Sequence, residues 1–403
     1  HCVTSTSLFL FFFQDVTSYS GYLTVNKQYN SNLFFWFIPS TGDYVNDPVL
    51  LWLQGGPGSP STYGLLMEHG PFAINDDIQL ERREHCWTNN HSVIYIDSPV
   101  GTGFSFTKND RGYARNQTQV GSELYKALQQ FFRLFPELRK NDFYITGESY
   151  GGKYVPALAY TIHKNNPDAK EKINLKGIAI GNGYTDPEHQ KGYAEYVYQL
   201  GLVDKEKAKT IKRFEVKATE FIYKKDFNQS VDMWGAALDE ISDAGVSYYN
   251  YLKDEDGVVL DELMNVYLDK RDSRRALHVG NITIGSQRVH SCLLEDMAKT
   301  VAPWFVVVAN HYRVLLYSGQ LDIIVAYPLT LNFLKNVEFN GIHEYRKAQR
   351  KLWYVDREIA GYSKSGGNFT EVLVRDAGHM VPADQPKWAE DLIYRFTRNQ
   401  PIH

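Results

Sequence analysis

The stretch that decides the fold reads Phe143-Tyr144-Ile145-Thr146-Gly147-Glu148-Ser149-Tyr150-Gly151. Its apolar beginning predicts a buried strand and the residues after it predict a helix, so the Gly-x-Ser-x-Gly pattern falls at a strand-to-helix turn. Such a turn holds a serine hydroxyl clear of the sheet, and glycines flank it because side chains there would collide with neighbouring backbone. Chance alone gives roughly 0.1 to 0.2 such patterns in a chain of this length. The strand and helix context therefore favours a nucleophile at Ser149 over a glycine turn with a bystander serine.

A serine hydroxyl becomes a useful nucleophile when a histidine takes its proton and a carboxylate orients that histidine. Two residues later in the chain fit these roles, Asp322 and His379, and each follows a predicted buried strand. The order Ser149, Asp322, His379 is the order of the α/β-hydrolase triad. Either residue alone would be interpreted as an ordinary loop residue, but three residues in this order at strand ends predict a triad.

An acyl-transfer site also needs backbone N–H donors that point at the developing oxyanion. The glycine-rich segment 54–58 follows the predicted strand 49–53 and could supply one donor, because glycines let the backbone approach a substrate closely. The N–H groups of Gly56 and Tyr150 form the predicted oxyanion hole. The alternative is an ordinary loop at the end of a strand.

The first half of the chain alternates strand-like and helix-like patterns, which is typical of an α/β sheet with crossover helices. Continuous apolar runs indicate strands buried on both faces, so we expect one mostly parallel sheet in an α/β-hydrolase fold. Between two of these runs, the spacing of apolar residues over 124–132 predicts a helix, with Ser122 as its cap. The strands are expected at 21–25, 33–38, 49–53, 93–96, 143–145, 178–180, 314–317 and 372–374.

The middle of the chain differs in composition from the segments on either side of it. Segment 184–300 is richer in Lys, Glu, Asp and Tyr, and it lacks the continuous apolar runs of its flanks. Its helical patterns suit a cap over one end of the sheet, where long additions usually carry substrate contacts. We therefore expect a hydrolase core in two parts, 15–183 and 301–403, with a helical cap insertion at 184–300.

Composition excludes several classes of protein. The 403 residues correspond to two or three domain-sized units, or to one large α/β domain with insertions. A hydrophobic share of 43% and a charged share of 22% are those of a folded protein. A net charge of −4 is too small for electrostatic capture of nucleic acid. The three cysteines allow at most one internal disulfide, and without Cys-x-x-Cys or His-Glu-x-x-His the sequence predicts neither a metal site nor a cofactor.

Three features bear on the compartment. The apolar run 8–13 has no basic residue before it, and we interpret it as at most a remnant of a secretory segment. The run 301–317 is interrupted by Asn310, His311 and Arg313, so no membrane span is expected. Asn-x-Ser/Thr sequons exceed the roughly two to three expected by chance, which favours a glycoprotein over an accidental set of polar loops. They lie at Asn90, Asn116, Asn228, Asn281 and Asn368.

Several segments are informative together: Leu51-Trp52-Leu53-Gln54-Gly55-Gly56-Pro57-Gly58, Glu68-His69-Gly70-Pro71, 97–105, Gly147-Glu148-Ser149-Tyr150, Gly181-Asn182-Gly183-Tyr184-Thr185-Asp186-Pro187, Gly319-Gln320-Leu321-Asp322 and Gly378-His379-Met380-Val381-Pro382. Together they resemble the serine carboxypeptidase family, whose members remove the C-terminal residue of a peptide. The resemblance runs from about residue 15 to the C-terminus and is greatest to the vitellogenic-type branch of animal carboxypeptidases.

The resemblance implies a triad of Ser149, Asp322 and His379 and an oxyanion hole of Gly56 and Tyr150. It also implies that the free carboxylate of the peptide is bound by Gln54, Glu68 and Glu148. Two glutamates beside a substrate carboxylate cannot all be charged without strong repulsion, so at least one proton is shared and the pKa of its acid is raised. We therefore expect an acidic working pH. Separately, we expect the peptidase in the secretory pathway, either secreted or lysosomal (vacuolar).

Besides Ser59-Pro60, which stands where many members have Cys-Ser, the chain departs from the family pattern at two points. Gln54 stands where the family generally has asparagine, although the vitellogenic-type branch has glutamine. No cysteine lies between Gly245 and Cys292, where family members staple the cap with disulfides. The second departure concerns the rigidity and shape of the cap and leaves the triad untouched.

Two other functions fit the same fold. An esterase, lipase or acyltransferase would use the same triad, but it has no use for buried acids that recognise a carboxylate, so Glu68 and Glu148 favour the peptidase. A catalytically inert binding scaffold is disfavoured because all triad residues are present. The expected partners are peptide or protein C-termini as substrates, and the sequence leaves the oligomeric state open, a homodimer included.

Overall fold

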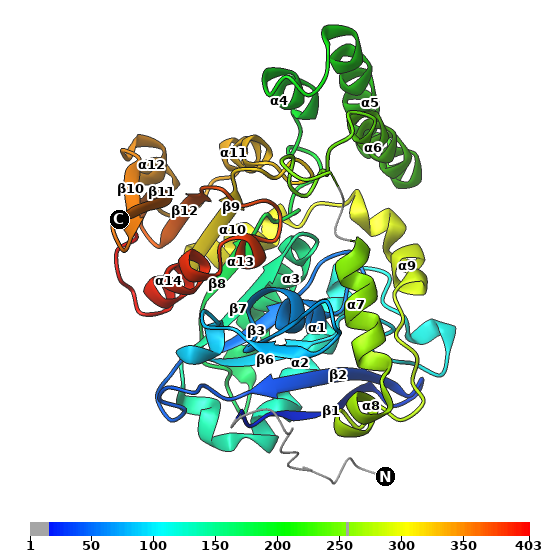
Figure 1. The fold of residues 1–403 in the computed structure, drawn as a ribbon, viewed down its shortest axis with the longest axis vertical. Coiled ribbons are helices and arrows are strands. Elements are labelled where there is room, and N and C mark those ends of the chain that lie inside the picture. The colour runs from blue at the N-terminus through cyan, green and yellow to red at the C-terminus, as the bar shows by residue number, and fades with distance from the viewer. Residues whose placement is uncertain (1–15, 255–257) are drawn as a thin grey trace.

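The structure, a computed structural model, describes residues 16–254 and 258–403, so the apolar run 8–13 lies outside the described residues. A ten-stranded sheet forms its centre (Figure 1). The strands are β1 (Tyr19–Asn26), β2 (Ser31–Ile38), β3 (Val49–Leu53), β6 (Ser92–Ile96), β7 (Phe143–Glu148), β8 (Leu175–Gly181), β9 (Arg313–Gly319), β10 (Lys351–Val355), β11 (Glu358–Gly366) and β12 (Phe369–Val374), and a separate pair is formed by β4 (Phe72–Ile74) and β5 (Leu80–Arg82). Their order across the large sheet is β1-β2-β6-β3-β7-β8-β9-β12-β11-β10.

The central strands, from β6 to β12 in this order, run parallel, and the outer strands pair antiparallel at both edges. All the predicted strands lie in this one sheet, which confirms the mostly parallel α/β architecture. Strands β2, β3 and β6 are buried along their whole length, as their continuous apolar runs require. Because the central strands are parallel, the residues that follow β7, β9 and β12 meet at one edge of the sheet.

Alternate side chains of each strand face opposite layers of helices. Leu51 and Leu53 pack in the core that also holds α2 (Gln117–Leu134) and α3 (Gly151–Asn165). Leu50 and Trp52 pack in the core that holds α14 (Pro386–Thr397). The sheet is therefore covered on both faces.

Helix α2 begins earlier than the sequence predicts. It begins at Gln117 with Asn116 as its cap, and not at Ser122. The side-chain oxygen of Asn116 accepts a hydrogen bond of 2.9 Å from the N–H of Gln119, and asparagine caps a helix as well as serine does. The apolar stripe also begins earlier than the pattern suggested, because Val120 in the first turn is fully buried.

The remaining helices are α1 (Ser61–Tyr63), α4 (Tyr193–Gln199), α5 (Lys205–Tyr223), α6 (Phe227–Ser242), α7 (Val258–Asp269), α8 (Arg271–Ala276), α9 (Gln287–Met297), α10 (Ala302–His311), α11 (Tyr327–Lys335), α12 (Ile342–Lys347), α13 (Val381–Asp384) and the helical turn η1 (Gly64–His69). Within 184–300 they form two groups. Helices α4–α6 share a small core with Ile323 and Leu329 and stand at the top of Figure 1. Helices α7 and α9 instead contribute to the main cores. The division into core and cap at 184 and 300 stays a prediction.

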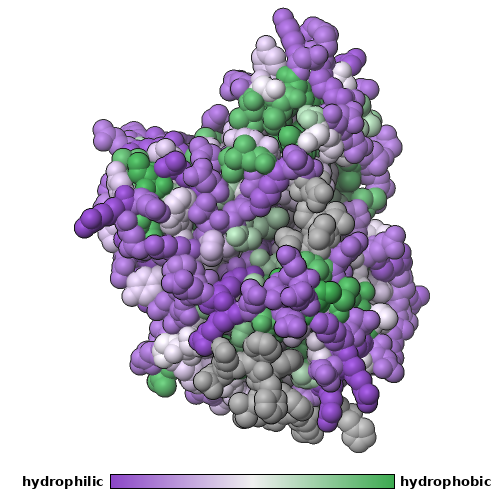
Figure 2. All heavy atoms as spheres, in the orientation of Figure 1, coloured by the Kyte–Doolittle hydropathy of each residue, from purple (hydrophilic) through white to green (hydrophobic). Residues whose placement is uncertain are grey.

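The surface on the face shown in Figure 2 is mostly hydrophilic, with apolar side chains exposed in small groups. No helix in the described ranges combines the length and the apolar character of a membrane span. Cys86 is buried and Cys292 is half-buried, and both are free. Cys2 lies outside the described residues.

Candidate active site

Ser149 lies at the turn between β7 and α3, at the carboxyl edge of the sheet. Its φ of 59° is in the left-handed region, which a residue with a side chain adopts only when its surroundings hold it there. The N–H of Ser149 donates to the carbonyl of Gly181 (3.1 Å), and its own carbonyl accepts from the N–H of Tyr184 (2.8 Å). A Cβ on Gly55 would lie 2.6 Å from the Cβ of Ser149, so only glycine fits against this turn. The local structure is that of a nucleophile elbow.

His379 and Asp322 form the other half of the predicted triad. The Nδ1 atom of His379 lies 2.9 Å from Oδ2 of Asp322, and the two side chains are 2% and 0% exposed. Asp322 follows β9 and His379 follows β12, and the backbone N–H of His379 donates to the carbonyl of Tyr249 (2.7 Å). When Nδ1 of His379 carries the ring proton and donates it to Asp322, Nε2 is the nitrogen that can accept a proton.

The Nε2 atom of His379 is buried and has no hydrogen-bond partner among the described residues. Ser149 and His379, both described, are therefore not hydrogen-bonded to each other in this structure. The serine hydroxyl turns about a single bond, and catalytic hydrogen bonds of this kind often tighten only when substrate binds. The structure thus pairs Asp322 with His379 and leaves Nε2 available for the serine proton.

Asn182 contacts the predicted triad, a role that the sequence did not predict. Its side-chain amide donates to Oδ2 of Asp322 (2.5 Å), and its side-chain oxygen accepts from the backbone N–H of Gly319 (3.1 Å). Asn182 is fully buried and its φ is 43°, a conformation that asparagine tolerates better than most residues. It therefore holds the carboxylate that contacts Nδ1 of His379. The signal was present as the segment 181–183, but nothing in the sequence showed which side chain the amide would meet.

We expect Asn182→Ala to lower the free energy of unfolding by about 2–3 kcal/mol, because a buried carboxylate loses a hydrogen bond. Urea unfolding measures this change. Asn399→Ala is the matched control, since Asn399 also has a positive φ (56°) but is exposed. Equal losses in the two variants would show that backbone strain, and not the bond to Asp322, sets the cost.

The predicted oxyanion donors lie on two segments in contact. A Cβ on Gly55 would lie 2.6 Å from the backbone nitrogen of Tyr150, so segment 54–58 lies directly against the turn after Ser149. Neither the N–H of Gly56 nor that of Tyr150 donates a hydrogen bond within the described part of the chain. Two unused donors beside a serine fit an oxyanion hole.

The residues expected to bind a carboxylate also lie together. The amide nitrogen of Gln54 donates to Oε1 of Glu148 (3.0 Å), and its amide oxygen accepts from the indole N–H of Trp52 (2.7 Å). Because the indole can only donate, this contact fixes which end of the amide faces the acid. Glu68 in η1 is 0% exposed and Glu148 at the end of β7 is 1% exposed.

Burial is the main cause of the raised pKa values of both acids. It raises the pKa of Glu68 to about 7, against the lowering effect of the neighbouring Glu148 and Gln54 side chains. Burial, and then the negative charge of Glu68, raise the pKa of Glu148 well above its usual range. With both acids charged, neither oxygen of Glu68 has a donor among the described residues. A shared proton supplies one, so at acidic pH the pair can donate to a bound carboxylate.

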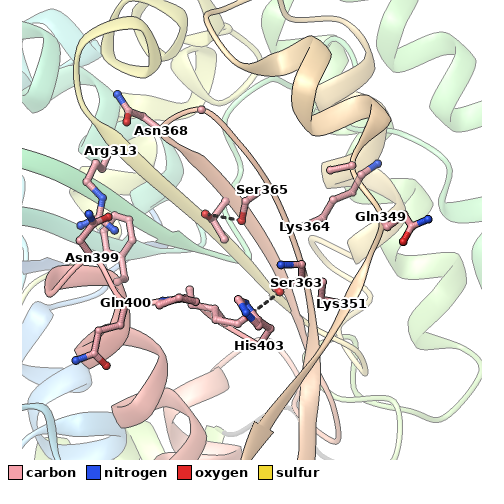
Figure 3. Close-up of a pocket in the computed structure, with 16 residues that line it drawn as sticks. Arg313, Gln349, Lys351, Ser363, Lys364, Ser365, Asn368, Asn399, Gln400 and His403 are labelled. Atoms are coloured by element: carbon pink, nitrogen blue, oxygen red, sulfur yellow. Dashed lines mark hydrogen bonds between the residues drawn. The ribbon is translucent and has the colours of Figure 1, made fainter.

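A hollow of about 440 Å³ lies at the opposite edge of the sheet (Figure 3). Its lining includes Arg313 at the amino end of β9 and Asn368 just before β12. Since the triad residues follow the carboxyl ends of the strands, this hollow is not part of the catalytic site. Asn368, one of the predicted glycosylation residues, is exposed there.

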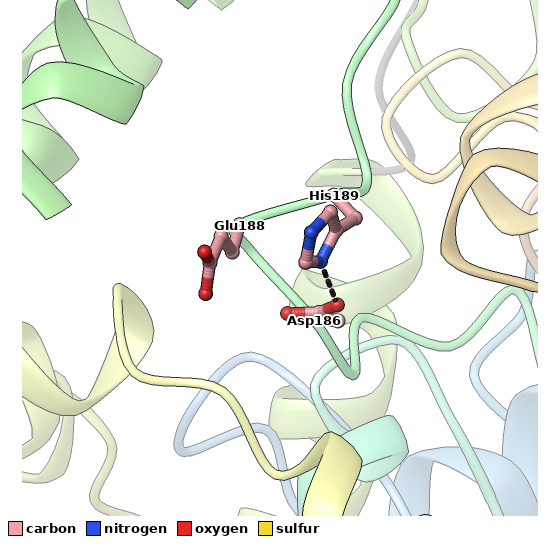
Figure 4. A group of neighbouring side chains, drawn as sticks. All are labelled: Asp186, Glu188 and His189. Atoms are coloured by element: carbon pink, nitrogen blue, oxygen red, sulfur yellow. Dashed lines mark hydrogen bonds and ion pairs between the residues drawn. The ribbon is translucent and has the colours of Figure 1, made fainter. Parts of the chain in front are cut away.

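Asp186, Glu188 and His189 bring three potential ligand atoms within 4.8 Å of one another (Figure 4). The Nδ1 atom of His189 lies 2.6 Å from Oδ2 of Asp186, and Glu188 interacts with the hydroxyl of Tyr223. Asp186 and His189 thus contact each other and Glu188 contacts Tyr223, so each of the three side chains has a partner within the chain. The expectation that the protein binds no metal stays a prediction.

The fold defines a class, the α/β-hydrolases, and the carboxyl edge of the sheet has the geometry of a serine hydrolase. A family model described as serine carboxypeptidase matches residues 11–399. The venom serine carboxypeptidase of Apis mellifera is 50% identical over 397 residues, which are 96% of this chain and 85% of that protein. The vitellogenic carboxypeptidase of Aedes aegypti is 47% identical over 395 residues, which are 95% of this chain and 83% of that protein.

The solved structure of a prohormone-processing carboxypeptidase from Saccharomyces cerevisiae has the same fold. Its TM-score is 0.85 at 22% identity, over 95% of this chain and 92% of that one. The chain therefore belongs to the serine carboxypeptidase family and is a hydrolase of the serine carboxypeptidase type. These findings confirm the resemblance, the likeness to the vitellogenic-type branch and the α/β-hydrolase fold.

Proposed function

We propose that the chain releases the C-terminal residue of peptides through an acyl-enzyme on Ser149. The Nε2 atom of His379 takes the proton of the Ser149 hydroxyl as Oγ attacks the carbonyl carbon of the last peptide bond. The N–H groups of Gly56 and Tyr150 stabilise the oxyanion, and His379 gives the proton to the leaving amine. Water, activated by the same histidine, then releases the shortened peptide. Asp322 orients His379 and stabilises its charged form.

The observation that carries this proposal is the buried pair Glu68 and Glu148 near the catalytic histidine. The charge of His379 lowers the pKa of Glu68, and the charge of Asp322 raises that of Glu148, so both acids lie within electrostatic reach of the triad. Gln54 adds an oriented amide. The free carboxylate at the end of a peptide substrate would accept hydrogen bonds from these side chains.

We expect peptide hydrolysis to decline as pH rises through 7. Below that pH the acid pair holds a proton and donates to the substrate carboxylate; above it Glu68 ionises and repels that carboxylate. The value of kcat/KM for a blocked dipeptide should fall about tenfold per pH unit above 7. An ester or amide substrate without a terminal carboxylate should decline less over the same range.

Glu68→Gln removes the acid whose ionisation causes the decline, so it should weaken the alkaline decline for peptides and leave the ester profile unchanged. Glu371→Gln is the matched control, because burial also raises the pKa of Glu371 to about 7. That residue lies in β12, away from the proposed carboxylate site, and its variant should keep the wild-type difference. Identical pH profiles for peptide and ester in the wild type would contradict the proposed role of the glutamates.

The two alternative functions, an esterase or acyltransferase and an inert scaffold, predict different behaviour of the same site. An esterase or acyltransferase leaves Glu68 and Glu148 without a ligand, and its activity would not depend on a free carboxylate in the substrate. A catalytically inert scaffold would not react with an active-site-directed phosphonate. Labelling of Ser149 together with a preference for free C-termini separates the proposed function from both.

We further propose that the insertion at 184–300 supplies substrate contacts. Tyr249, which belongs to it, packs on His379 with ring centroids 5.2 Å apart. The backbone N–H of Ile323 donates to the carbonyl of Tyr248 (3.0 Å). The insertion therefore borders both loops that carry the Asp–His pair.

We also propose a glycoprotein of the secretory pathway, either secreted or lysosomal. Asn116, Asn228, Asn281 and Asn368 are exposed, and Asn90 is half-buried. One relative carries the name of a venom protein, which supports the same route. Mass spectrometry before and after deglycosylation tests the sequons, and light scattering decides between a monomer and a homodimer.

A further inference from the structure

Helix α9 contacts the catalytic helix α3 through a buried polar network. The Oδ2 atom of Asp296, near the end of α9, accepts hydrogen bonds from the hydroxyl of Tyr150 (2.8 Å) and from the amide of Gln117 (2.7 Å). Asp296 is 3% exposed and Tyr150 is 2% exposed. The backbone N–H of this same tyrosine is one of the two proposed oxyanion donors.

A lysine fixes the same end of α9. The ammonium group of Lys153, one turn after Ser149, donates to the backbone carbonyls of Asp296, Met297 (3.0 Å) and Lys299 (2.6 Å). Lys153 is 0% exposed, so its three donors meet three acceptors with no water needed. A cation at the carboxyl end of a helix is also favoured by the helix dipole.

The other end of α9 contacts the loop of the second donor. A Cβ on Gly58 would lie 2.9 Å from the carbonyl oxygen of Ser286 and 3.3 Å from the Cβ of Val289. Gly285, just before the helix, exchanges two backbone hydrogen bonds with Gly103 (2.7 and 2.9 Å). The start of α9 is thus fixed to the core beside the loop that carries Gly56.

From these contacts we infer that α9 is a strut that sets the spacing of the two oxyanion donors, with Asp296 as a positioning residue acting through the hydroxyl of Tyr150. This inference rests on the proposed oxyanion hole. The strut explains why a buried carboxylate, a buried lysine and a buried tyrosine hydroxyl lie together directly behind the nucleophile. A purely structural network would stabilise the fold without changing the stabilisation of the transition state.

Tyr150→Phe tests the strut with the smallest change, because it keeps the ring and the backbone N–H and removes one oxygen. We expect kcat per active site, counted by phosphonate titration, to fall roughly 10-fold to 10²-fold, since a donor displaced by a fraction of an ångström loses part of its effect. KM for a blocked dipeptide should change less than about twofold, because the carboxylate site is untouched.

Asp296→Ala should give a similar loss, and the double variant should lose no more than the larger single loss, because both changes break one linkage. Asp296→Asn keeps an acceptor oxygen and should recover part of kcat. Tyr144→Phe is the matched control: Tyr144 is equally buried and its hydroxyl donates to the carbonyl of Thr397 (2.9 Å), far from the donors. It should lower stability and leave kcat unchanged.

The inference is overturned if Tyr150→Phe keeps wild-type kcat per titrated site, or if its loss adds in full to that of Asp296→Ala. Other results would show that the proposed function itself is wrong. In that case wild-type enzyme is not labelled by the phosphonate, or Ser149→Ala retains activity.

Discussion

Ser149→Ala is expected to lower kcat for peptide hydrolysis by roughly 10⁶-fold. Removal of the hydroxyl abolishes the acyl-enzyme route, and the residual rate then comes from substrate binding and from the N–H donors of Gly56 and Tyr150 acting on direct attack by water. The loss should fall on kcat and leave the affinity for a C-terminal carboxylate unchanged, because Gln54 and Glu148 remain in place.

The variant should fold normally, since alanine fills less space than serine and Ser149 makes its conformation-holding hydrogen bonds through the backbone. Thermal unfolding checks this, and Ser365→Ala, at an exposed position lining the hollow at the opposite edge, serves as the control. A Ser149→Ala enzyme that retains more than about 1% of wild-type kcat would exclude the acyl-enzyme mechanism.

Asp322→Asn is expected to lower kcat by roughly 10³-fold to 10⁴-fold. The new amide has one oxygen, whereas Oδ2 of Asp322 now faces both His379 and the amide of Asn182. If the amide nitrogen faces His379, it donates to Nδ1 and the ring must carry its proton on Nε2, where it cannot accept from serine. If the oxygen faces His379, the amide nitrogen meets the N–H of Val325, which now donates to Oδ1 (3.3 Å). Either orientation loses the charge that stabilises the imidazolium.

The test compares kcat of Asp322→Asn with that of Asp391→Asn. Oδ2 of Asp391 also accepts from two side chains, Trp353 (2.9 Å) and Arg395 (2.7 Å), but it lies in α14 away from the triad. The control should lose stability and keep kcat. Comparable activity in the two variants would contradict the assignment of Asp322.

The sheet could be predicted from the sequence because each of its central strands is a short apolar run that is buried on both faces. Helix starts were harder: Ser122 and Asn116 are both good caps, and only the position of buried Val120 decides between them. The helices of 184–300 were recognisable as helices. Their separation into a group that packs on itself and a group that joins the main cores depends on contacts with distant residues.

The residues of the candidate site could also be predicted from the sequence only in part. Ser149, Asp322 and His379 could be proposed because strand ends predict where they meet. Asn182, which bonds Asp322, could not, since an amide signals no partner until the fold places one beside it. Glu68 lies in a helical turn without any local pattern of its own, and the resemblance to a family was needed to single it out.

Phosphonate labelling followed by peptide mass spectrometry tests the central claim most directly. At pH 5 we predict one phosphonyl adduct, on Ser149, which is blocked by a peptide with a free C-terminal carboxylate and not by the same peptide as its amide. The adduct should be absent from His379→Ala. An adduct on another residue, no adduct at all, or equal protection by the acid and the amide would contradict the proposed mechanism.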